Sequence, residues 1–580
     1  MMFRLKEFYK KLGADQLVAV WLIVWWTVNM VTAAASELAN DEAYYHLFAR
    51  NLEWGYFDHP PVTALLVWLG ERFFGGEFAV RAFFTLLQPA YLLLFWRMIR
   101  PSDASRRDAG LYVMICASML ILQLYGFIAV PDGPLLLSSV LFLFAFKRFT
   151  EDGKHAWLWM GLAIGFMAYC KYQGALVLVF ALLANVRWFV QRPKKIALLL
   201  ASGAVAFVTI LPHLLWQYHH DWASFAYHLS GRNGVFRLSN ITEFLLNMAV
   251  VFSPFFVPLW VQSFRKMRPS TPFERALWLF PPAFILFFTA SAVRGYVQPQ
   301  WAIVAVFGLI WSLFGYARRH PRTRRYVMTM GWVTIALMVL VRAELIWNPL
   351  GLRFEVFDNR TSYNQIAAIA DGRPVIFDSS YAVAAKYAFY NDTDEAFSQP
   401  DVDHRTSQWQ FMDNDLRFAG SEVLVQVDPS RYIDLEAERG ELRGVKLANG
   451  KDFWYVVVKD FRPTRNMHIE TEDFTLPSTV HAGERFDFRL KISNPYPYDI
   501  VVDGREFVLE MLWGWRKQTF SHYPLVQGLA VPAGGEVEVD CSFTIPDSLA
   551  PQSYNVGFAV RHKDMYTWFC GKPMVTQLEK

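Results

Sequence analysis

The feature that most constrains this chain is a series of apolar segments, each about 20 residues long, which is the length a helix needs to cross the hydrocarbon core of a bilayer. Of the 580 residues, 54% are hydrophobic and 19% are charged, whereas about a quarter of the residues are charged in soluble domains. The pattern predicts a multi-pass α-helical membrane protein of about eleven spans with a soluble part attached. The expected spans are 16–35, 77–98, 108–127, 131–148, 156–170, 173–190, 196–217, 241–263, 274–293, 298–316 and 325–347.

Lysine and arginine cluster in alternate connections between these segments. The basic stretches are the N-terminus, 97–107, 147–154, 187–195, 265–268 and 318–325. Cytoplasmic loops carry an excess of Lys and Arg, so we expect a cytoplasmic N-terminus and, with an odd number of spans, a periplasmic or external C-terminus. The first apolar run shows no convincing small-residue cleavage site and is expected to stay as a span. We expect the bacterial inner membrane.

The character of the sequence changes near residue 350. We expect a transmembrane domain over 1–350 that contains an external loop at 36–76, then a small external α/β domain over 351–465. Residues 466–580 show roughly seven short alternating runs between Pro, Gly and Asn turns, which predicts an immunoglobulin-like sandwich. Cys116 and Cys170 are expected to be inert core residues. For Cys541 and Cys570, a disulfide and two buried thiols are both open.

The external loop 36–76 gathers acids and aromatics where the first span ends. Asp41 and Glu42 are suited to take a proton from an acceptor hydroxyl or amine; alternatively, they begin a solvated helix that runs to about residue 53. Tyr45 belongs to a set of aromatics suited to stack on a sugar or to lie at the headgroup level. Asp58 and His59 precede two prolines that fix the backbone, and they either face a substrate or form a turn.

Further polar residues lie at the same ends of the expected spans. Asp132 either caps the fourth span or also faces the site. Lys171, followed by Tyr172, either snorkels to the headgroups or binds an anionic lipid phosphate. Arg232 is suited to contact a phosphate, and Arg294 and Gln298 lie at the entry of the tenth span.

Several kinds of chemistry are not supported by the sequence. It contains no glycine-rich phosphate loop, no zinc-spaced cysteines and no nucleophile elbow. We therefore expect no cofactor and no nucleic-acid partner. A metal site from His219, His220 and Asp221 is disfavoured because adjacent histidines do not easily share one ion; a divalent metal is conceivable but not evident.

As an ordered set, these motifs resemble the C-superfamily (GT-C) glycosyltransferases. Within that superfamily the chain is similar to a bacterial branch related to protein O-mannosyltransferases and to the lipid A aminoarabinose transferase. The resemblance covers about residues 15–350. It is carried by Asp41-Glu42 with the tyrosine that follows, 55–61 (Gly-Tyr-Phe-Asp-His-Pro-Pro), 131–134 (Pro-Asp-Gly-Pro), 171–174 (Lys-Tyr-Gln-Gly) and 216–232.

The resemblance implies an inverting enzyme that takes a sugar from a polyprenyl-phosphate donor and passes it to a lipid, glycan or protein acceptor on the external face. Asp41 matches the position of the catalytic base, and Glu42 would assist or position it. The lipid phosphate would be held by Lys171 together with Arg294 or Arg232. The remaining positions that would contact substrates are Tyr45, Asp58, His59, Asp132, Tyr172 and Gln298.

The chain departs from the family pattern at two positions. A lysine is usual where this sequence has His59, which puts in doubt how strongly that position binds the donor phosphate. Many relatives carry His-Trp-Pro near the tenth span, but residues 300–302 here are Gln-Trp-Ala, so no histidine role is carried over.

Two other functions compete with sugar transfer. A lipid flippase or transporter would line a path with intramembrane charges and often shows paired, broken spans in matching halves, but no such pairing is visible and the charges gather on one side. A sensor or anchor would not need the acidic loop. The transferase is therefore favoured, with its sugar and its acceptor not identified.

Overall fold

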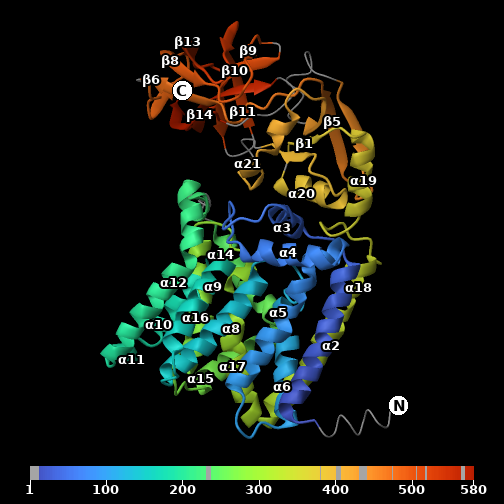
Figure 1. The fold of residues 1–580 in the computed structure, drawn as a ribbon, viewed down its shortest axis with the longest axis vertical. Helices are drawn as coiled ribbons and strands as arrows, with labels where there is room; N and C mark the ends of the chain where they lie inside the picture. The colour runs from blue at the N-terminus through green and yellow to red at the C-terminus, as the bar shows by residue number, and fades with distance from the viewer. Residues whose placement is uncertain are drawn as a thin grey trace. The chain divides into compact units, whose positions relative to one another are not determined.

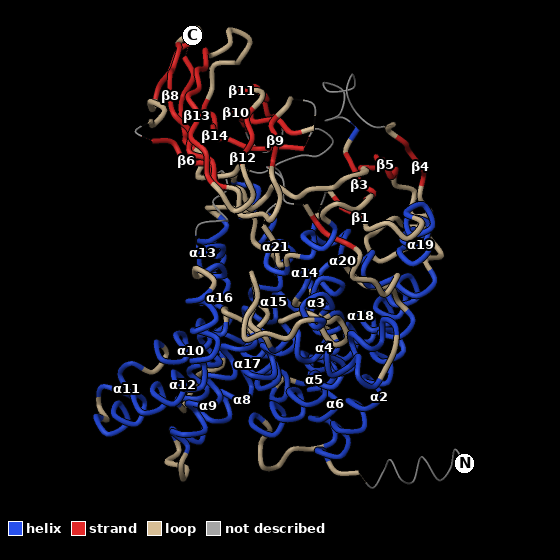
Figure 2. The backbone as a smooth tube through the Cα atoms, turned by 45° about the horizontal axis from the view of Figure 1, so that its top comes forward, coloured by secondary structure: helices blue, strands red, loops and turns tan. Residues whose placement is uncertain are grey.

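The computed structural model describes residues 12–229, 237–378, 380–399, 406–429, 441–472, 474–504, 506–515, 519–562 and 569–579. The chain divides into two compact units, Met1–Phe357 and Asp358–Lys580. The described part of the first unit is helical, and all described strands belong to the second (Figure 2).

The first unit is a bundle of long apolar helices (Figure 1). Six helices among the described residues are long and apolar enough to cross a membrane. They are α2 (Ala14–Ala35), α5 (Gly76–Ile99), α8 (Asp132–Thr150), α12 (Pro193–His219), α16 (Pro272–Ala292) and α18 (Pro321–Trp347). The pair α14 (Leu238–Val251) and η1–α15 (Pro254–Lys266) would make a seventh span if counted as one, although it is bent by 90°. The chain is thus a multi-pass membrane protein.

The other apolar segments form helices that are short or broken. They are α6 (Arg106–Ala117) with α7 (Leu120–Leu124), α9 (Ala156–Cys170), α10 (Gly174–Leu183) with α11 (Val186–Val190), and η2 (Pro299–Ala302) with α17 (Ala305–Arg319). Every expected span therefore contains helix, but only six to seven satisfy the length criterion within the described residues. The count of eleven stays a prediction.

The basic connections meet at one end of the bundle. Arg100, after α5, pairs with Asp15 at the start of α2 at 3.1 Å. Arg318, at the end of α17, pairs with Asp103 before α6 at 2.7 Å. Lys147 Nζ also donates to the Met98 carbonyl at 3.2 Å, and Lys195 pairs with Asp152 at 2.7 Å. Four of the basic stretches, 97–107, 147–154, 187–195 and 318–325, therefore lie at one end of the bundle.

The opposite end of the bundle carries the acidic loop. Its two helices are α3 (Asn40–Arg50) and α4 (Val62–Phe73), and both lie across this end of the bundle in Figure 1. Helix α4 packs closely on α5 at Gly70, where a Cβ atom would come within 1.9 Å of the Ala79 carbonyl oxygen. Only glycine permits this approach.

The second unit begins with a mixed five-stranded sheet in the order β2-β1-β3-β5-β4. Its members are β1 (Val375–Phe377), β2 (Ala396–Ser398), β3 (Val423–Val427), β4 (Arg443–Lys446) and β5 (Asp452–Val458). β1 pairs in parallel with β2 and β3, whereas β5 is antiparallel to β3 and β4. Helices α19 (Asn359–Ala370) and α20 (Tyr381–Tyr390) accompany it, with the short α21 (Trp409–Met412) and η3 (Asn414–Phe418). This part has the expected α/β character.

The remainder of the second unit has ten described strands, more than the roughly seven expected. They are β6 (His468–Glu472), β7 (Thr479–His481), β8 (Arg485–Ser493), β9 (Ile500–Val502), β10 (Phe507–Trp515), β11 (Thr519–Val526), β12 (Leu529–Val531), β13 (Glu536–Thr544), β14 (Ser553–His562) and β15 (Met574–Glu579). They form sheets in the orders β11-β10-β14-β15-β7, β13-β8-β6 and β12-β9. The immunoglobulin-like class and the domain boundaries stay predictions. Cys541 and Cys570 are buried thiols that form no disulfide with each other.

A buried ion pair joins two neighbouring strands, β10 and β14, of the larger sheet. Glu510 on β10 is fully buried and accepts a hydrogen bond from Arg561 Nε on β14 at 2.8 Å. His522 on β11 lies 3.1 Å from the same carboxylate. Burial alone would raise the pKa of Glu510, but Arg561 and His522 together hold it at about 2.

We predict that these strands lose protection in acid. An unfolded glutamate has a pKa of about 4.3, so the pair stabilises the sheet fully above that pH and progressively less as the pH falls toward 2. Between about pH 5.5 and pH 3 the loss should be about 2 kcal/mol, measured by hydrogen exchange of peptides from β10 and β14 after correction for the intrinsic rate.

Glu510→Gln should be destabilised already at about pH 5.5, because it leaves Arg561 buried without a counter-charge, and should show a flatter pH dependence. The control is Glu538→Gln, which removes an exposed acid on β13. Its hydrogen exchange should show the same pH dependence as that of the unmodified protein. An identical pH dependence in Glu510→Gln would contradict the assignment.

Candidate active site

The acidic pair lies on the first turn of α3. The Glu42 carboxylate accepts a hydrogen bond from the Ala39 backbone N–H at 2.9 Å, so it caps the helix. Asp41 is half-buried one residue earlier. The helix start that the sequence left as an alternative is therefore present, and it leaves the two acids in different surroundings.

Glu42 is locked by a cation from α5. Arg81 Nε and Nη2 reach its two carboxylate oxygens at 2.6 and 2.5 Å, and the Ala129 N–H donates to it at 2.9 Å. Glu42 is 0% and Arg81 2% exposed. Arg81 Nη1 also donates to the Ser36 carbonyl at 2.7 Å. One buried pair thus joins the end of α2, the start of α3, α5 and the segment before α8.

A tyrosine connects Asp41 with a second buried ion pair. The phenol of Tyr125, just after α7, lies within electrostatic reach of both Asp41 and Asp132. Lys171 Nζ donates to the two Asp132 oxygens at 2.7 and 2.8 Å, and both residues are at least nine-tenths buried. The structure therefore brings together Asp41, Tyr125, Asp132 and Lys171, and the Lys171 charge is already compensated by a carboxylate.

The stretch between α3 and α4 is held by a histidine relay from α12. His213 Nδ1 lies 2.7 Å from the Trp54 carbonyl, which can only accept, so Nδ1 carries the proton. His213 Nε2 then accepts from the Tyr172 hydroxyl at 3.1 Å, and Gln217 Nε2 donates to the same hydroxyl oxygen at 3.1 Å. This chain of bonds fixes Tyr172 against the acidic loop.

Asp58 and His59 lie in the same part of the loop. The His228 Nε2–H, from α13 (Ala223–Leu229), donates to the Asp58 carbonyl at 3.0 Å. Asp58 is buried and acts electrostatically on the Tyr172 phenol. The His59 ring packs on Tyr45 with ring centroids 5.5 Å apart. Tyr45 is itself buried, so here it supports the loop from within.

The remaining expected site residues lie apart from this cluster. Arg294 and Gln298 follow α16 and are exposed; the Gln298 side-chain oxygen accepts from Trp301 Nε1 at 3.0 Å. No described contact joins either residue to the acidic loop, and Arg294 forms no ion pair with a described carboxylate. Arg232 lies outside the described residues.

Sequence reasoning missed three members of the site: Arg81, Tyr125 and His213. Arg81 and His213 lie inside apolar helices, where an ionisable residue is costly and marks function by default, so this signal could have found them. Tyr125 had no such signal. For a metal, no group of three His, Cys, Asp or Glu side chains converges in the described part of the chain; His220 instead stacks on Trp216 at 4.0 Å.

Comparison with known proteins identifies relatives of this helical unit. Residues 58–216 match the family described as dolichyl-phosphate-mannose-protein mannosyltransferase. The fold is similar to that of ArnT from Cupriavidus metallidurans, with a TM-score of 0.55 at 15% identity over 76% of this chain and 97% of that chain. A second ArnT structure, bound to undecaprenyl phosphate, gives a TM-score of 0.54.

Two characterised proteins of Rhizobium johnstonii are similar in sequence. The lipid A galacturonosyltransferase RgtD is 24% identical over 345 residues, which cover 54% of this chain and 68% of RgtD. The lipopolysaccharide core galacturonosyltransferase RgtA is 29% identical over 214 residues, which cover 35% of this chain and 41% of RgtA. Both matches agree with the family match in the kind of reaction, the transfer of a sugar.

We predict that Arg81→Met loosens the acidic loop. The substitution leaves the buried Glu42 carboxylate without its cation, which typically costs about 3–5 kcal/mol. Hydrogen exchange of peptides from 39–50 should rise strongly. Arg72→Met, on the exposed side of α4, is the matched control and should leave this exchange unchanged; unchanged protection of α3 in Arg81→Met would count against the role of the pair.

Proposed function

We propose that the chain is a glycosyltransferase of the GT-C superfamily that transfers a sugar from a polyprenyl-phosphate donor to lipid A or the lipopolysaccharide core, as the family match, the two galacturonosyltransferases and the ArnT-like fold support. The observation that carries this proposal is the half-buried Asp41 beside the locked Glu42, at the end of the bundle opposite to the basic connections. The donor class is supported by the ArnT structure that holds undecaprenyl phosphate. The acceptor class is supported by the two galacturonosyltransferases.

Asp41 is the proposed general base. As the acceptor hydroxyl attacks the anomeric carbon of the donor, its proton passes to the Asp41 carboxylate, and the bond from that carbon to the phosphate oxygen breaks. The polyprenyl phosphate leaves with the electron pair, and the configuration is inverted.

Glu42 is proposed as a positioning residue. Its oxygens accept from Arg81, Ala39 and Ala129, so a proton taken up by Glu42 would break a buried, charge-assisted network. The same network fixes the first turn of α3 and, with it, Asp41. This fits the assisting role expected from the family resemblance.

The departing phosphate needs a fixed positive charge nearby. Such a charge stabilises the developing negative charge most strongly in a site that excludes water. Lys171 is proposed to supply this positive charge. Its ammonium group would donate hydrogen bonds to the donor phosphate while it stays paired with the Asp132 carboxylate. Arg294 is the second proposed cation, because it is exposed and makes no ion pair with a described residue. Tyr172 and His59 are proposed to contact the sugar or the phosphate from the loop.

The reaction is proposed to occur on the periplasmic face of the bacterial inner membrane. The basic end of the bundle would be cytoplasmic by the positive-inside rule, which puts the acidic loop in the periplasm. Asn40 on α3 donates to Glu355, after α18, so the chain leaves the helical unit on the side of the acidic loop. We therefore propose that Asp358–Lys580 is also periplasmic.

Asp41→Asn should abolish transfer without unfolding the protein. Loss of a general base typically costs about 10²–10⁴-fold in rate. The measurement is transfer by purified protein in liposomes, with radiolabelled polyprenyl-phosphate sugars as donors and lipid A or lipopolysaccharide core as acceptor. Glu37→Gln, an acid at the start of the same loop, is the control and should remain active.

Full activity of Asp41→Asn would end the assignment of the base. Movement of the labelled lipid between leaflets without transfer, in the unmodified protein, would instead support a flippase.

Lys171→Ala should raise the donor KM by about tenfold, as expected for the loss of one cation from a phosphate site. It also leaves Asp132 buried without a counter-charge, so stability falls as well. Lys171→Ala/Asp132→Ala removes both charges and should recover stability but not KM. If the double variant recovers both its stability and its donor KM, Lys171 serves only to neutralise Asp132.

A further inference from the structure

The arginine of α18 at position 342 is a buried cation without a buried anion. Arg342 is 8% exposed and donates only to neutral groups: Thr32 Oγ1 at 2.6 Å, Asn29 Oδ1 at 2.7 Å and Gln123 at 3.0 and 3.2 Å. It forms no ion pair with any described carboxylate. An uncompensated charge among membrane helices is expensive and marks a function unless a partner is supplied.

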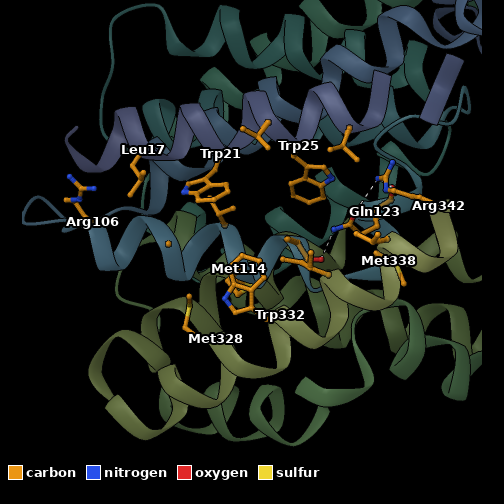
Figure 3. Close-up of a pocket in the computed structure, with 17 residues that line it drawn as sticks. Leu17, Trp21, Trp25, Arg106, Met114, Gln123, Met328, Trp332, Met338 and Arg342 are labelled. Carbon is orange, nitrogen blue, oxygen red and sulfur yellow. Dashed lines mark hydrogen bonds between the residues drawn. The ribbon is translucent and has the colours of Figure 1, made fainter. Parts of the chain in front are cut away.

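The Arg342 side chain lines a cavity of about 400 Å³ between α2, α6 and α18. Figure 3 shows Arg106 and Arg342 at opposite ends of this pocket, with Trp21, Trp25 and Trp332 between them. Apart from Gln123 and the two arginines, the residues that line it are apolar or glycine. The pocket is therefore an apolar groove with a cation at each end.

The groove opens on the outer surface of the bundle. Val24 on α2 is 48% and Trp332 on α18 is 56% exposed, and both line it. From Leu17 to Val28 it follows α2 over eleven helical rises, or about 16 Å, which is close to half of the roughly 30 Å hydrocarbon thickness of a bilayer. Arg342 lies about one and a half turns before the end of α18 at Trp347, and in a span that ends there it would lie near the lipid headgroups.

We propose that this groove binds an anionic phospholipid of the surrounding bilayer, with its phosphate on Arg342 and one acyl chain along α2. A phosphodiester supplies the missing anion and accepts bidentate hydrogen bonds from a guanidinium. The hydrocarbon chain supplies the apolar filling that the lining residues require. An uncharged ligand would leave Arg342 uncompensated, and a free phosphate would leave the groove unfilled.

The groove is separate from the acidic loop. Phe127 is 2% exposed, and the guanidinium groups of Arg342 and Arg81 lie 5.2 and 5.8 Å from its ring centroid. Both guanidinium groups thus pack on Phe127, but none of the residues that line the groove belongs to the acidic loop 36–76. The proposed lipid is therefore not the donor of the proposed reaction, and the experiment below tests this distinction. The bound lipid would stabilise the 123–127 segment, which Arg342 contacts and which contains Tyr125.

Gly110 permits a test that leaves Arg342 intact. It lines the groove on α6, and a Cβ at this position would meet no atom within 4 Å. Gly110→Leu should therefore fill the groove without strain, and leucine raises helix propensity. Gly203→Leu is the matched control, because Gly203 lies in α12 away from the groove and its Cβ would also meet no atom within 4 Å.

The experiment is native mass spectrometry of the full chain in detergent with dioleoyl phosphatidylglycerol or dioleoyl phosphatidylcholine, without any sugar donor. The unmodified protein and Gly203→Leu should bind one phosphatidylglycerol about tenfold more tightly than phosphatidylcholine. Gly110→Leu and Arg342→Gln should lose this preference, and phosphatidylglycerol should raise the melting temperature only where it binds.

Equal binding of the two phospholipids, or unchanged phosphatidylglycerol binding in Gly110→Leu, would overturn the proposal. Displacement of phosphatidylglycerol by inorganic phosphate alone would assign the site to a small anion and overturn it too. So would selective binding of undecaprenyl phosphate that Gly110→Leu abolishes, since the groove would then hold the carrier lipid. Because no transfer is measured, failure here leaves the proposed reaction untouched.

Discussion

Burying a carboxylate among membrane helices is unfavourable unless a cation and further donors meet it, and Glu42 satisfies both conditions. Arg81 contacts its two oxygens, and the backbone N–H groups of Ala39 and Ala129 complete the set. Because these groups come from three separate parts of the chain, the pair fixes where the acidic loop sits on the bundle. The position of Asp41 follows from it, one residue along the same helix turn.

Two further networks brace the same end of the bundle. The relay from Trp54 through His213 to Tyr172 holds the stretch between α3 and α4, and the buried pair of Asp132 and Lys171 joins α8 to the turn before α10. The opposite end is tied by surface ion pairs, which contribute little each. The buried networks that hold side chains in fixed positions are thus concentrated at the end where the chemistry is proposed, as expected for a site held on rigid elements.

Much of the helical unit could be predicted from the sequence, because the length and apolar character of a span are local properties. Details of shape and pairing were less predictable. The helix of the expected span 241–263 is bent by 90° at a break just before Pro254, and a proline cannot donate the backbone hydrogen bond of a continuous helix. In the second unit, short alternating runs predicted strands correctly but not their number, since pairing between strands depends on distant residues and bulges.

The sequence by itself determined that the chain spans a membrane several times and that acids gather beside the first span; both follow from composition and order alone. It could not decide which of two neighbouring acids is locked, because Arg81 lies 39 residues from Glu42. Nor could it give Lys171 its partner, since Asp132 is equally distant along the chain. Tertiary structure decided these roles, because the energetic effect of a charge inside a membrane protein depends on the group that neutralises it.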